Sequence, residues 1–204
     1  MVPCLIVIDD FLNDPEGFRQ KALTLNYSLP GPYPGLNSVE RIQVAGLDQI
    51  IGDVVRAPLH APWDSESSHL RCRLSLASNE VAKVHVDPSD WTGVLCLNRP
   101  EDCRGGTELY RHIPSGTDRM PIDDASLRAA GYASHEEMQE EILEKDALDR
   151  SKWEMTLSVP MRFNRLILIQ PKYWHTAGPG FGDSVQNGRL VYLMFFQQRR
   201  VSGL

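Results

Sequence analysis

Short stretches of strand-forming residues follow one another along much of this chain, and their spacing limits the folds that it can adopt. The breaks between them hold Ser, Asn, Asp, Pro and Gly, and over residues 71–111 they recur roughly every 8–12 residues. This spacing favours a β-sandwich or barrel over parallel βαβ units, because parallel strands need a long crossover connection. The predicted strands are residues 2–8, 71–77, 81–87, 92–98, 107–111, 165–170 and 189–197.

A helix is predicted near the N-terminus, from Pro15 to Leu25. Asp14 is a capping acid, and the proline occupies the first turn, where an N–H has no partner inside the helix in any case. Apolar residues then recur at helical spacing, so one face of the helix is expected to be buried. The segment 28–38 is dense in Pro and Gly and is predicted as a loop, whose Tyr33 is placed to cover a pocket.

Residues 121–152 interrupt the strand pattern and are predicted as a helical insertion. A capping box begins at Ser134, and Glu141 and Lys145 stand at the favourable i,i+4 spacing of a helix. Two roles are open for this insertion: a solvated helix that braces the fold, or a lid over a site at the mouth of a barrel. Because no linker or repeat divides the chain, residues 1–204 are expected to form one domain.

Composition excludes several classes of function. Of the 204 residues, 42% are hydrophobic and 24% charged, as in a globular protein with a core. The net charge is −6, and no basic run offers the face that a nucleic-acid-binding protein needs. No stretch approaches the roughly 18 apolar residues of a membrane span, and the N-terminus lacks the basic start of a signal peptide. The four cysteines lack the paired short spacing of a disulfide framework or zinc site. We therefore expect a cytoplasmic protein that binds neither nucleic acid nor membrane.

A histidine and an aspartate stand two residues apart at the end of the predicted strand 81–87. Residues i and i+2 of a strand point to the same face, about 7 Å apart, so His85 and Asp87 can hold one metal ion together. Pro88 ends the strand, which places the pair at its mouth. His-x-Asp alone is a weak signal, because most instances of the pattern bind no metal.

A second histidine, His175, follows the apolar strand 165–170 and precedes a turn rich in Gly and Pro. That position again places it at the mouth of a strand. Alone, it would be interpreted as a core histidine between aromatic neighbours. Together with His85 and Asp87 it makes the two-histidine, one-carboxylate facial triad of non-haem Fe(II) oxygenases, which leaves metal positions open for other ligands.

Arg189 opens the apolar strand 189–197, where a charged side chain is costly to bury unless it is paired. One interpretation is a strand-edge arginine in solvent or in a structural salt bridge. The other is an anchor for a ligand carboxylate, which a guanidinium binds with two parallel hydrogen bonds. Asn98 and Thr107 are further candidates for lining a barrel, by strand alternation. So are Arg71, Arg73 and Ser75, which share one strand face that is either solvated or turned inward.

In this order, His85-x-Asp87, His175 and Arg189 resemble the Fe(II)/2-oxoglutarate-dependent oxygenases, and within them the prolyl-4-hydroxylase-like branch. The segments before and after these residues are also similar to that branch. The similar segments are Ile8–Leu12, Val94–Asn98, Gly105–Leu109 and Asn164–Ile169 with Trp174-His175, and the resemblance covers residues 5–27, 70–112 and 155–197.

The resemblance implies a double-stranded β-helix (a jelly roll, or cupin-like fold) with the metal inside one end. It implies that the catalytic residues His85, Asp87 and His175 bind Fe(II), and that 2-oxoglutarate and O₂ are co-substrates. Arg189 would hold the distal carboxylate of 2-oxoglutarate, with Asn98 and Thr107 beside it. The expected reaction is hydroxylation of a C–H bond in an amino acid, a peptide or a small natural product; desaturation and cyclisation stay open.

The chain departs from the prolyl hydroxylases in places. Prolyl hydroxylases usually carry a lysine where this chain has Arg189. They often have a tyrosine on the strand that ends at Asn98, where this chain has Cys96. The insertion 121–152 is also unusual for that branch. Two other functions are therefore weighed: a cupin-like dioxygenase or isomerase that does not use 2-oxoglutarate, and a non-catalytic binding domain of the same fold. The carboxylate anchor argues against the first and the intact triad against the second. The substrate and the oligomeric state are not readable from the sequence.

Overall fold

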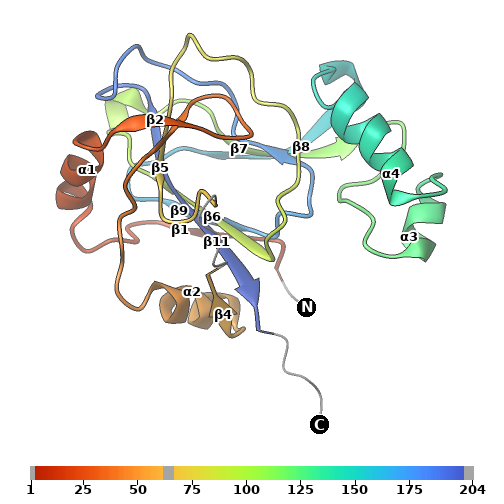
Figure 1. The fold of residues 1–204 in the computed structure, drawn as a ribbon, viewed down its shortest axis with the longest axis horizontal. Helices are drawn as coiled ribbons and strands as arrows, with labels where there is room; N and C mark the ends of the chain where they lie inside the picture. The colour runs from red at the N-terminus through yellow and green to blue at the C-terminus, as the bar shows by residue number, and fades with distance from the viewer. Residues whose placement is uncertain (1–2, 62–66, 200–204) are drawn as a thin grey trace.

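The computed structural model describes residues 3–61 and 67–199, and their strands form two antiparallel sheets (Figure 1). The larger sheet has the order β1 (Leu5–Ile8), β9 (Leu166–Ile169), β6 (Trp91–Cys96), β11 (Arg189–Gln198), β5 (Cys72–Ser75), β3 (Leu36–Ser38) and β2 (Tyr27–Pro30), with β4 (Leu59–His60) paired to the end of β11. The smaller sheet has the order β10 (His175–Thr176), β7 (Gly106–His112) and β8 (Trp153–Pro160). The prediction of a mostly β, antiparallel fold is confirmed.

Strand β11 separates two interiors of the protein, because successive side chains of a strand point to opposite faces. One set is fully buried in the main hydrophobic core: Leu190, Tyr192, Met194 and Phe196. The alternate set lines a cavity on the other face: Arg189, Val191, Leu193, Phe195 and Gln197. The cavity lies between the two sheets, since β7 and β10 of the smaller sheet contribute to its other side.

Two helices pack on the main core side. Helix α1 (Pro15–Leu23) begins as predicted, with the Asp14 carboxylate accepting the Gly17 N–H at 2.9 Å. Helix α2 (Leu47–Val55) was not predicted, because it begins after Gly46 in a left-handed conformation with no side-chain cap. Its apolar residues at i,i+4 spacing, all in the core, are the signal that could have found it: Leu47, Ile51 and Val55.

The predicted helical insertion is present and forms a lobe at the side of β8 (Figure 1). It holds α3 (Asp124–Ala129), α4 (His135–Met138) and a π-helical segment, Gln139–Asp146. The capping residue is confirmed, since Ser134 Oγ accepts the Glu137 N–H at 3.2 Å. The expected pairing of Glu141 with Lys145 is wrong: Lys145 pairs with Glu140 at 3.0 Å, because a π-helix brings residues i and i+5 together.

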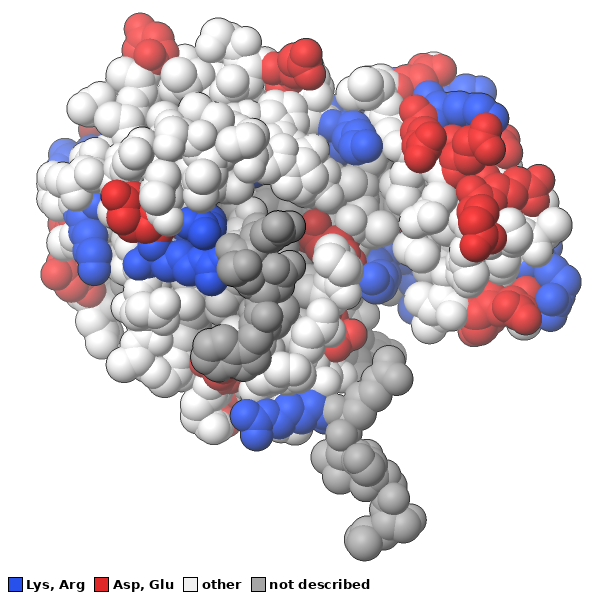
Figure 2. All heavy atoms as spheres, viewed as in Figure 1, with Lys and Arg blue, Asp and Glu red and all other residues white. Residues whose placement is uncertain are grey.

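The insertion contributes Met138 and Ile142 to a hydrophobic cluster that it shares with Trp153 and Trp174 from outside it. Its exposed face is strongly acidic, as the right-hand lobe in Figure 2 shows, and carries Glu136, Glu137, Glu140, Glu141 and Glu144. A surface of this sign repels a phosphate backbone. No helix in the described part of the chain is long and apolar enough to cross a membrane.

Two further predictions of local structure are wrong. The segment 28–38 is not all loop: its ends form β2 and β3, and only the Pro- and Gly-rich residues between them make the turn. The segment 81–87 is not a regular strand, because its N–H groups bond to different segments, including the carbonyls of Ala147, His175 and Pro171. Val2, the first residue of the predicted strand 2–8, lies outside the described residues.

The remaining predicted strands are confirmed, with ends that differ by a few residues. Strand β8, which the sequence pattern did not reveal, pairs with β7 and needs a glycine opposite it. A Cβ on Gly106 would stand 1.9 Å from the Val159 carbonyl oxygen. The described residues also include two short 3₁₀ helices, Pro100–Asp102 and Arg150–Lys152. All four cysteines are free.

Candidate functional site

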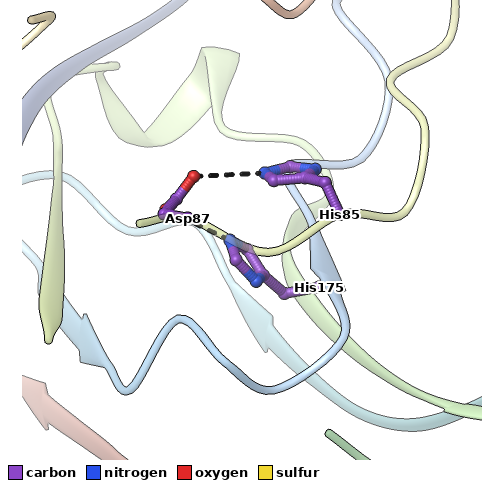
Figure 3. A group of neighbouring side chains, drawn as sticks. All are labelled: His85, Asp87 and His175. Atoms are coloured by element: carbon purple, nitrogen blue, oxygen red, sulfur yellow. Dashed lines mark ion pairs between the residues drawn. The ribbon is translucent and has the colours of Figure 1, made fainter. Parts of the chain in front are cut away.

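The three residues of the predicted facial triad converge at one end of the cavity (Figure 3). Ligand atoms of His85, Asp87 and His175 all lie within 4.8 Å of one another, and all three side chains are buried. The Nε2 atoms of the two histidines stand 3.9 and 3.5 Å from the carboxylate oxygens of Asp87. Three donors at this spacing, facing one point, can hold a single metal ion.

The backbone brings the triad together by hydrogen bonds between distant segments. His85 and His175 exchange two of them: the His85 N–H donates to the His175 carbonyl at 2.9 Å, and the reverse bond is 3.1 Å. Asp87 N–H donates to the Pro171 carbonyl at 3.1 Å, and Lys172 Nζ donates to the Asp87 carbonyl at 3.0 Å. These bonds place the His-x-Asp segment alongside the segment that leads into β10.

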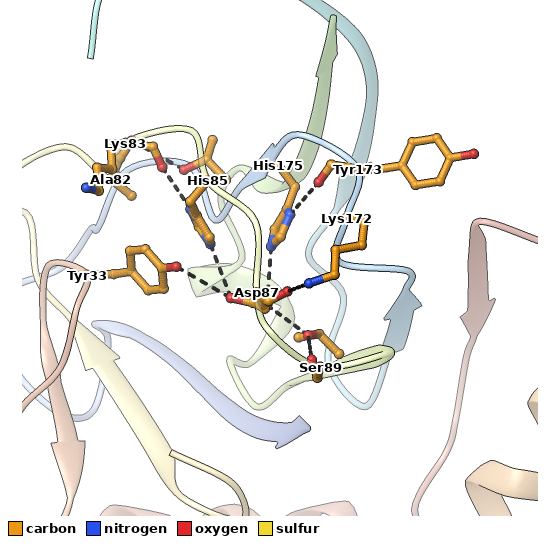
Figure 4. A network of polar contacts seen from close by, with 11 residues as sticks. Tyr33, Ala82, Lys83, His85, Asp87, Ser89, Lys172, Tyr173 and His175 are labelled. Atoms are coloured by element: carbon orange, nitrogen blue, oxygen red, sulfur yellow. Dashed lines mark hydrogen bonds and ion pairs between the residues drawn. The ribbon is translucent and has the colours of Figure 1, made fainter. Parts of the chain in front are cut away.

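Both imidazole rings are oriented in the same way by their own backbone. Nδ1 of His85 lies 2.9 Å from the Lys83 carbonyl, and Nδ1 of His175 lies 2.8 Å from the Tyr173 carbonyl (Figure 4). A carbonyl can only accept, so each Nδ1 carries a proton, and Nε2 is the atom of each ring that faces Asp87. This tautomer is the one that ligates a metal through Nε2, with a carbonyl as its outer partner.

Hydrogen bonds and charges keep Asp87 ionised in spite of its burial. Burial raises the pKa of this carboxyl, but the contact with His175 and the bond from Thr92 Oγ1, 2.8 Å from Oδ2, lower it to about 2. Ser89 Oγ lies 3.0 Å from the Thr92 hydroxyl and extends the network. Burial, and secondly the neighbouring His175, lower the pKa of His85 to about 3. The site therefore holds one carboxylate and a neutral His85, the forms that bind metal ions.

The triad opens into a cavity of about 330 Å³ between the two sheets. Its walls are largely apolar, with Val94, Ile169, Val191, Leu193 and Phe195 from the larger sheet. A cavity of this size that combines apolar walls with converging polar groups, among them the triad and Arg189, is typical of a small-molecule site. No residue of the insertion is among the described lining residues, which favours its bracing role.

Arg189 lies in the wall of this cavity and is only 3% exposed. Its Nε has no hydrogen-bond partner, and within residues 3–61 and 67–199 no acidic side chain forms an ion pair with it. Burial lowers the pKa of Arg189, although Cys96 and Glu108 partly offset that effect. The interpretation of Arg189 as a solvated or salt-bridged arginine does not hold here. A buried guanidinium with an unused donor can bind an anion that enters the cavity.

The two other residues predicted beside the anchor have different positions. Thr107 is buried and lines the cavity. Asn98 is buried but does not line the cavity, and its amide bonds to the backbone on either side of Arg189. Its Nδ2 donates to the Gly188 carbonyl at 2.7 Å, and its Oδ1 accepts the Leu190 N–H at 2.8 Å. Asn98 therefore holds the start of β11, and Arg189 with it.

The strand face of Arg71, Arg73 and Ser75 turns partly inward. Arg73 and Ser75 are buried and line the cavity, whereas Arg71 donates to the carbonyl of Ser38 and lies outside it. Sequence reasoning did not find the contact of Tyr33 with the triad. The sequence marks this tyrosine only as a pocket cover, and no local pattern links it to His85.

Comparison with known proteins identifies the family of this chain. Residues 2–196 match the sequence profile of a family of unknown function, DUF6445. The chain belongs to this family. No curated protein matches this DUF6445 member. Among solved structures, a selenomethionine-labelled Fe(II)/(alpha)ketoglutarate-dependent dioxygenase, TqaL, is similar at 10% identity and a TM-score of 0.46, over 98% of this chain and 84% of that one.

Proposed function

We propose that this chain is a non-haem Fe(II)/2-oxoglutarate-dependent dioxygenase with a jelly-roll fold, formed by residues 1–204 as a single domain. The observation that carries the proposal is a triad of metal-binding type and an unpaired, buried arginine in the walls of one cavity. Either feature alone is compatible with a different activity. Together they favour this one, because the triad leaves metal positions open for a bidentate co-substrate whose free carboxylate the arginine would bind.

The donor set fits Fe(II). His85 and His175 present their Nε2 atoms, and Asp87 supplies the single carboxylate. Imidazole and carboxylate ligands suit iron, and two histidines with one carboxylate form the arrangement of non-haem Fe(II) oxygenases. The carbonyls behind each ring and the hydroxyl of Thr92 behind the carboxylate are outer partners of the kind that orient metal ligands.

The other end of the cavity fits the distal carboxylate of 2-oxoglutarate. Arg189 would bind it through its guanidinium, which is otherwise without an ion-pair partner in the described chain. Asn98 would keep the arginine in place by holding Gly188 and Leu190, and the Thr107 hydroxyl would contribute a further hydrogen bond. The apolar side chains between the arginine and the triad would exclude water from the site.

When bound, Fe(II) with 2-oxoglutarate and O₂ supplies the oxidising chemistry, which yields succinate and CO₂ and inserts one oxygen atom into a substrate C–H bond. The protein contributes position: the triad holds the metal, the arginine orients the co-substrate, and the remaining cavity holds the substrate against the metal. We propose an amino acid, a peptide or a small natural product as substrate. The acidic surface argues against nucleic acid.

Anaerobic titration of the protein with Fe(II) and 2-oxoglutarate tests the proposal, because the chelate of the two has a visible charge-transfer band. The band should form in the wild type, be lost in His175→Ala and need much more 2-oxoglutarate in Arg189→Ala. Arg162→Ala is the matched control, since this surface arginine pairs with Asp9 away from the cavity and should leave the titration unchanged.

Metal binding without the band would contradict the use of 2-oxoglutarate and favour the cupin-like alternative. Failure to bind metal would favour the non-catalytic alternative. A band that is equally strong in Arg189→Ala would show that the co-substrate is held elsewhere.

A further inference from the structure

One aromatic side chain from outside the triad contacts two of its members. Tyr33 stacks on His85, with ring centroids 3.8 Å apart and ring planes inclined by 28°. Its hydroxyl donates to Asp87 Oδ1 at 3.5 Å, the long end of hydrogen bonding, as Figure 4 shows. Neither contact is local, because Tyr33 belongs to the turn between β2 and β3.

A buried arginine, Arg73, holds the turn that carries this tyrosine by hydrogen bonds. The Arg73 guanidinium donates to the Tyr33 carbonyl, to the Pro34 carbonyl at 2.9 and 3.2 Å and to Asn37 Oδ1 at 3.0 Å. Ser75 Oγ donates to the Pro34 carbonyl as well, at 3.1 Å. Burying a guanidinium on neutral acceptors is costly, and the result is a turn fixed at its centre.

The residues of the turn add to its rigidity. Prolines stand on both sides of Tyr33 and restrict its backbone. Gly35 has a φ of +97°, and a Cβ there would stand 2.4 Å from the Leu74 carbonyl oxygen, so only glycine lets the turn lie this close to β5. The tyrosine ring is therefore presented to His85 by a preformed support.

We propose that Tyr33 is a positioning residue of the metal centre, which holds His85 and Asp87 in their ligating orientation and shields that side of the metal from solvent. This inference rests on the metal centre of the proposed function. The ring prevents His85 from turning out of line. The hydroxyl on Oδ1 and the Thr92 hydroxyl on Oδ2 together stop the Asp87 carboxylate from rotating. Outer partners of this kind tune metal affinity.

The test uses Co(II) as the probe, because its visible absorption reports the coordination geometry without turnover. Tyr33→Leu should weaken Co(II) binding about tenfold or more, within the 10–100-fold range of outer-partner mutations, and should change the spectrum. Tyr33→Phe keeps the stack and loses only a long hydrogen bond, so its affinity should fall by no more than a few-fold. Release of Co(II) to a chelator should be fastest in Tyr33→Leu.

Two further variants keep the test decisive. Tyr27→Phe removes the hydroxyl of a tyrosine on the same hairpin, which bonds to the Ala22 carbonyl, and should bind Co(II) like the wild type. Arg73→Lys leaves Tyr33 in the chain but loses the fork that holds its turn, and should also release Co(II) faster.

The inference is overturned if Tyr33→Leu and Arg73→Lys both bind and release Co(II) like the wild type with an unchanged spectrum. It is also overturned if Tyr27→Phe weakens binding as much as they do. If the wild type itself binds no Co(II), the metal centre of the proposed function fails first. The two failures are thus distinguishable.

Discussion

His85 and His175 form an isolated antiparallel bridge, and this bridge joins the segment that carries His85 and Asp87 to the segment that carries His175. Each donates its N–H to the carbonyl of the other, and the ring centroids lie 4.3 Å apart. Each Nδ1 also bonds to the carbonyl two residues earlier in its own segment. The backbone therefore sets both the distance between the rings and the direction of both Nε2 atoms before any metal binds.

Replacing Asp87 by asparagine should remove the negative charge that the site offers to a cation. An amide is nearly the same size and can keep the bond from Thr92, but it is a weak metal ligand. We expect a loss of Co(II) affinity larger than the roughly 100-fold upper end for outer partners, measured by calorimetric titration. Asp90→Asn is the control, because Asp90 is exposed and its carboxylate accepts the Gln198 N–H, a bond that an amide oxygen can also accept. Equal affinity in Asp87→Asn would exclude this carboxylate as a ligand.

Replacing Arg189 by methionine should separate stability from function. The wild type buries a cation with an unsatisfied Nε, and an apolar side chain of similar length relieves that cost. We expect the metal-free variant to gain about 1–3 kcal/mol in free energy of unfolding in urea, while 2-oxoglutarate binding is lost. Arg165→Met, which breaks the 2.6 Å contact with Asp9, should bring no gain. A destabilised Arg189→Met would mean that the arginine supports the fold.

The convergence of His85, Asp87 and His175 was predictable, because its signals are of two kinds that sequence carries well. His85 and Asp87 are two residues apart, a spacing that puts two side chains on one face of an extended segment, and both face the same point although 81–87 is not a regular strand. His175 and Arg189 were predicted as site residues from their positions at the ends of apolar strands and from a family resemblance. Arg189 was singled out because burying an unpaired charge is costly. In the structure Arg189 lies in the cavity wall.

The rest of the site was not predictable, because it depends on contacts between distant segments. Tyr33 reaches His85 from a turn that Arg73 holds against β5, and neither residue carries a local signal of that contact. Asn98 was expected in the cavity by alternation, yet its amide bonds to the β11 backbone. The apolar spacing near Lys145 also gives no signal of a π-helix, which is why Lys145 pairs with Glu140 and not with the expected Glu141.

Protonation of His69 should couple the stability of the protein to pH. Burial, partly offset by Asp48, lowers the pKa of His69 to about 4, and its Nδ1 accepts the Phe195 N–H at 2.9 Å. The unfolded chain takes up this proton near pH 6.5, before the folded protein does. Stability should therefore be fully present above pH 6.5 and fall as the pH drops toward 4.

His69→Asn tests this dependence, since an amide oxygen can replace Nδ1 as acceptor but does not titrate. Chemical unfolding between pH 7.5 and 4 should show a shallower loss of stability in the variant, by about one proton bound on unfolding. His85 contributes to the slope of both proteins in the same direction. Identical slopes would show that His69 is not the group that titrates.

A buried contact fastens the insertion to the sheet, and its loss should loosen the lobe. His112 is fully buried, with Nε2 3.0 Å from Asp146 Oδ2 and Nδ1 2.8 Å from Ser115 Oγ. His112→Ala leaves both partners without their bonds and should cost about 2–4 kcal/mol in free energy of unfolding. Limited proteolysis between residues 139 and 148 should accelerate. Glu140→Gln, which breaks only the exposed pair with Lys145, should change neither measurement.

Metal affinity should stay at the wild-type value in both variants, because no described lining residue of the cavity belongs to the insertion. A fall in metal affinity in His112→Ala alone would instead assign the lobe a part in shaping the site.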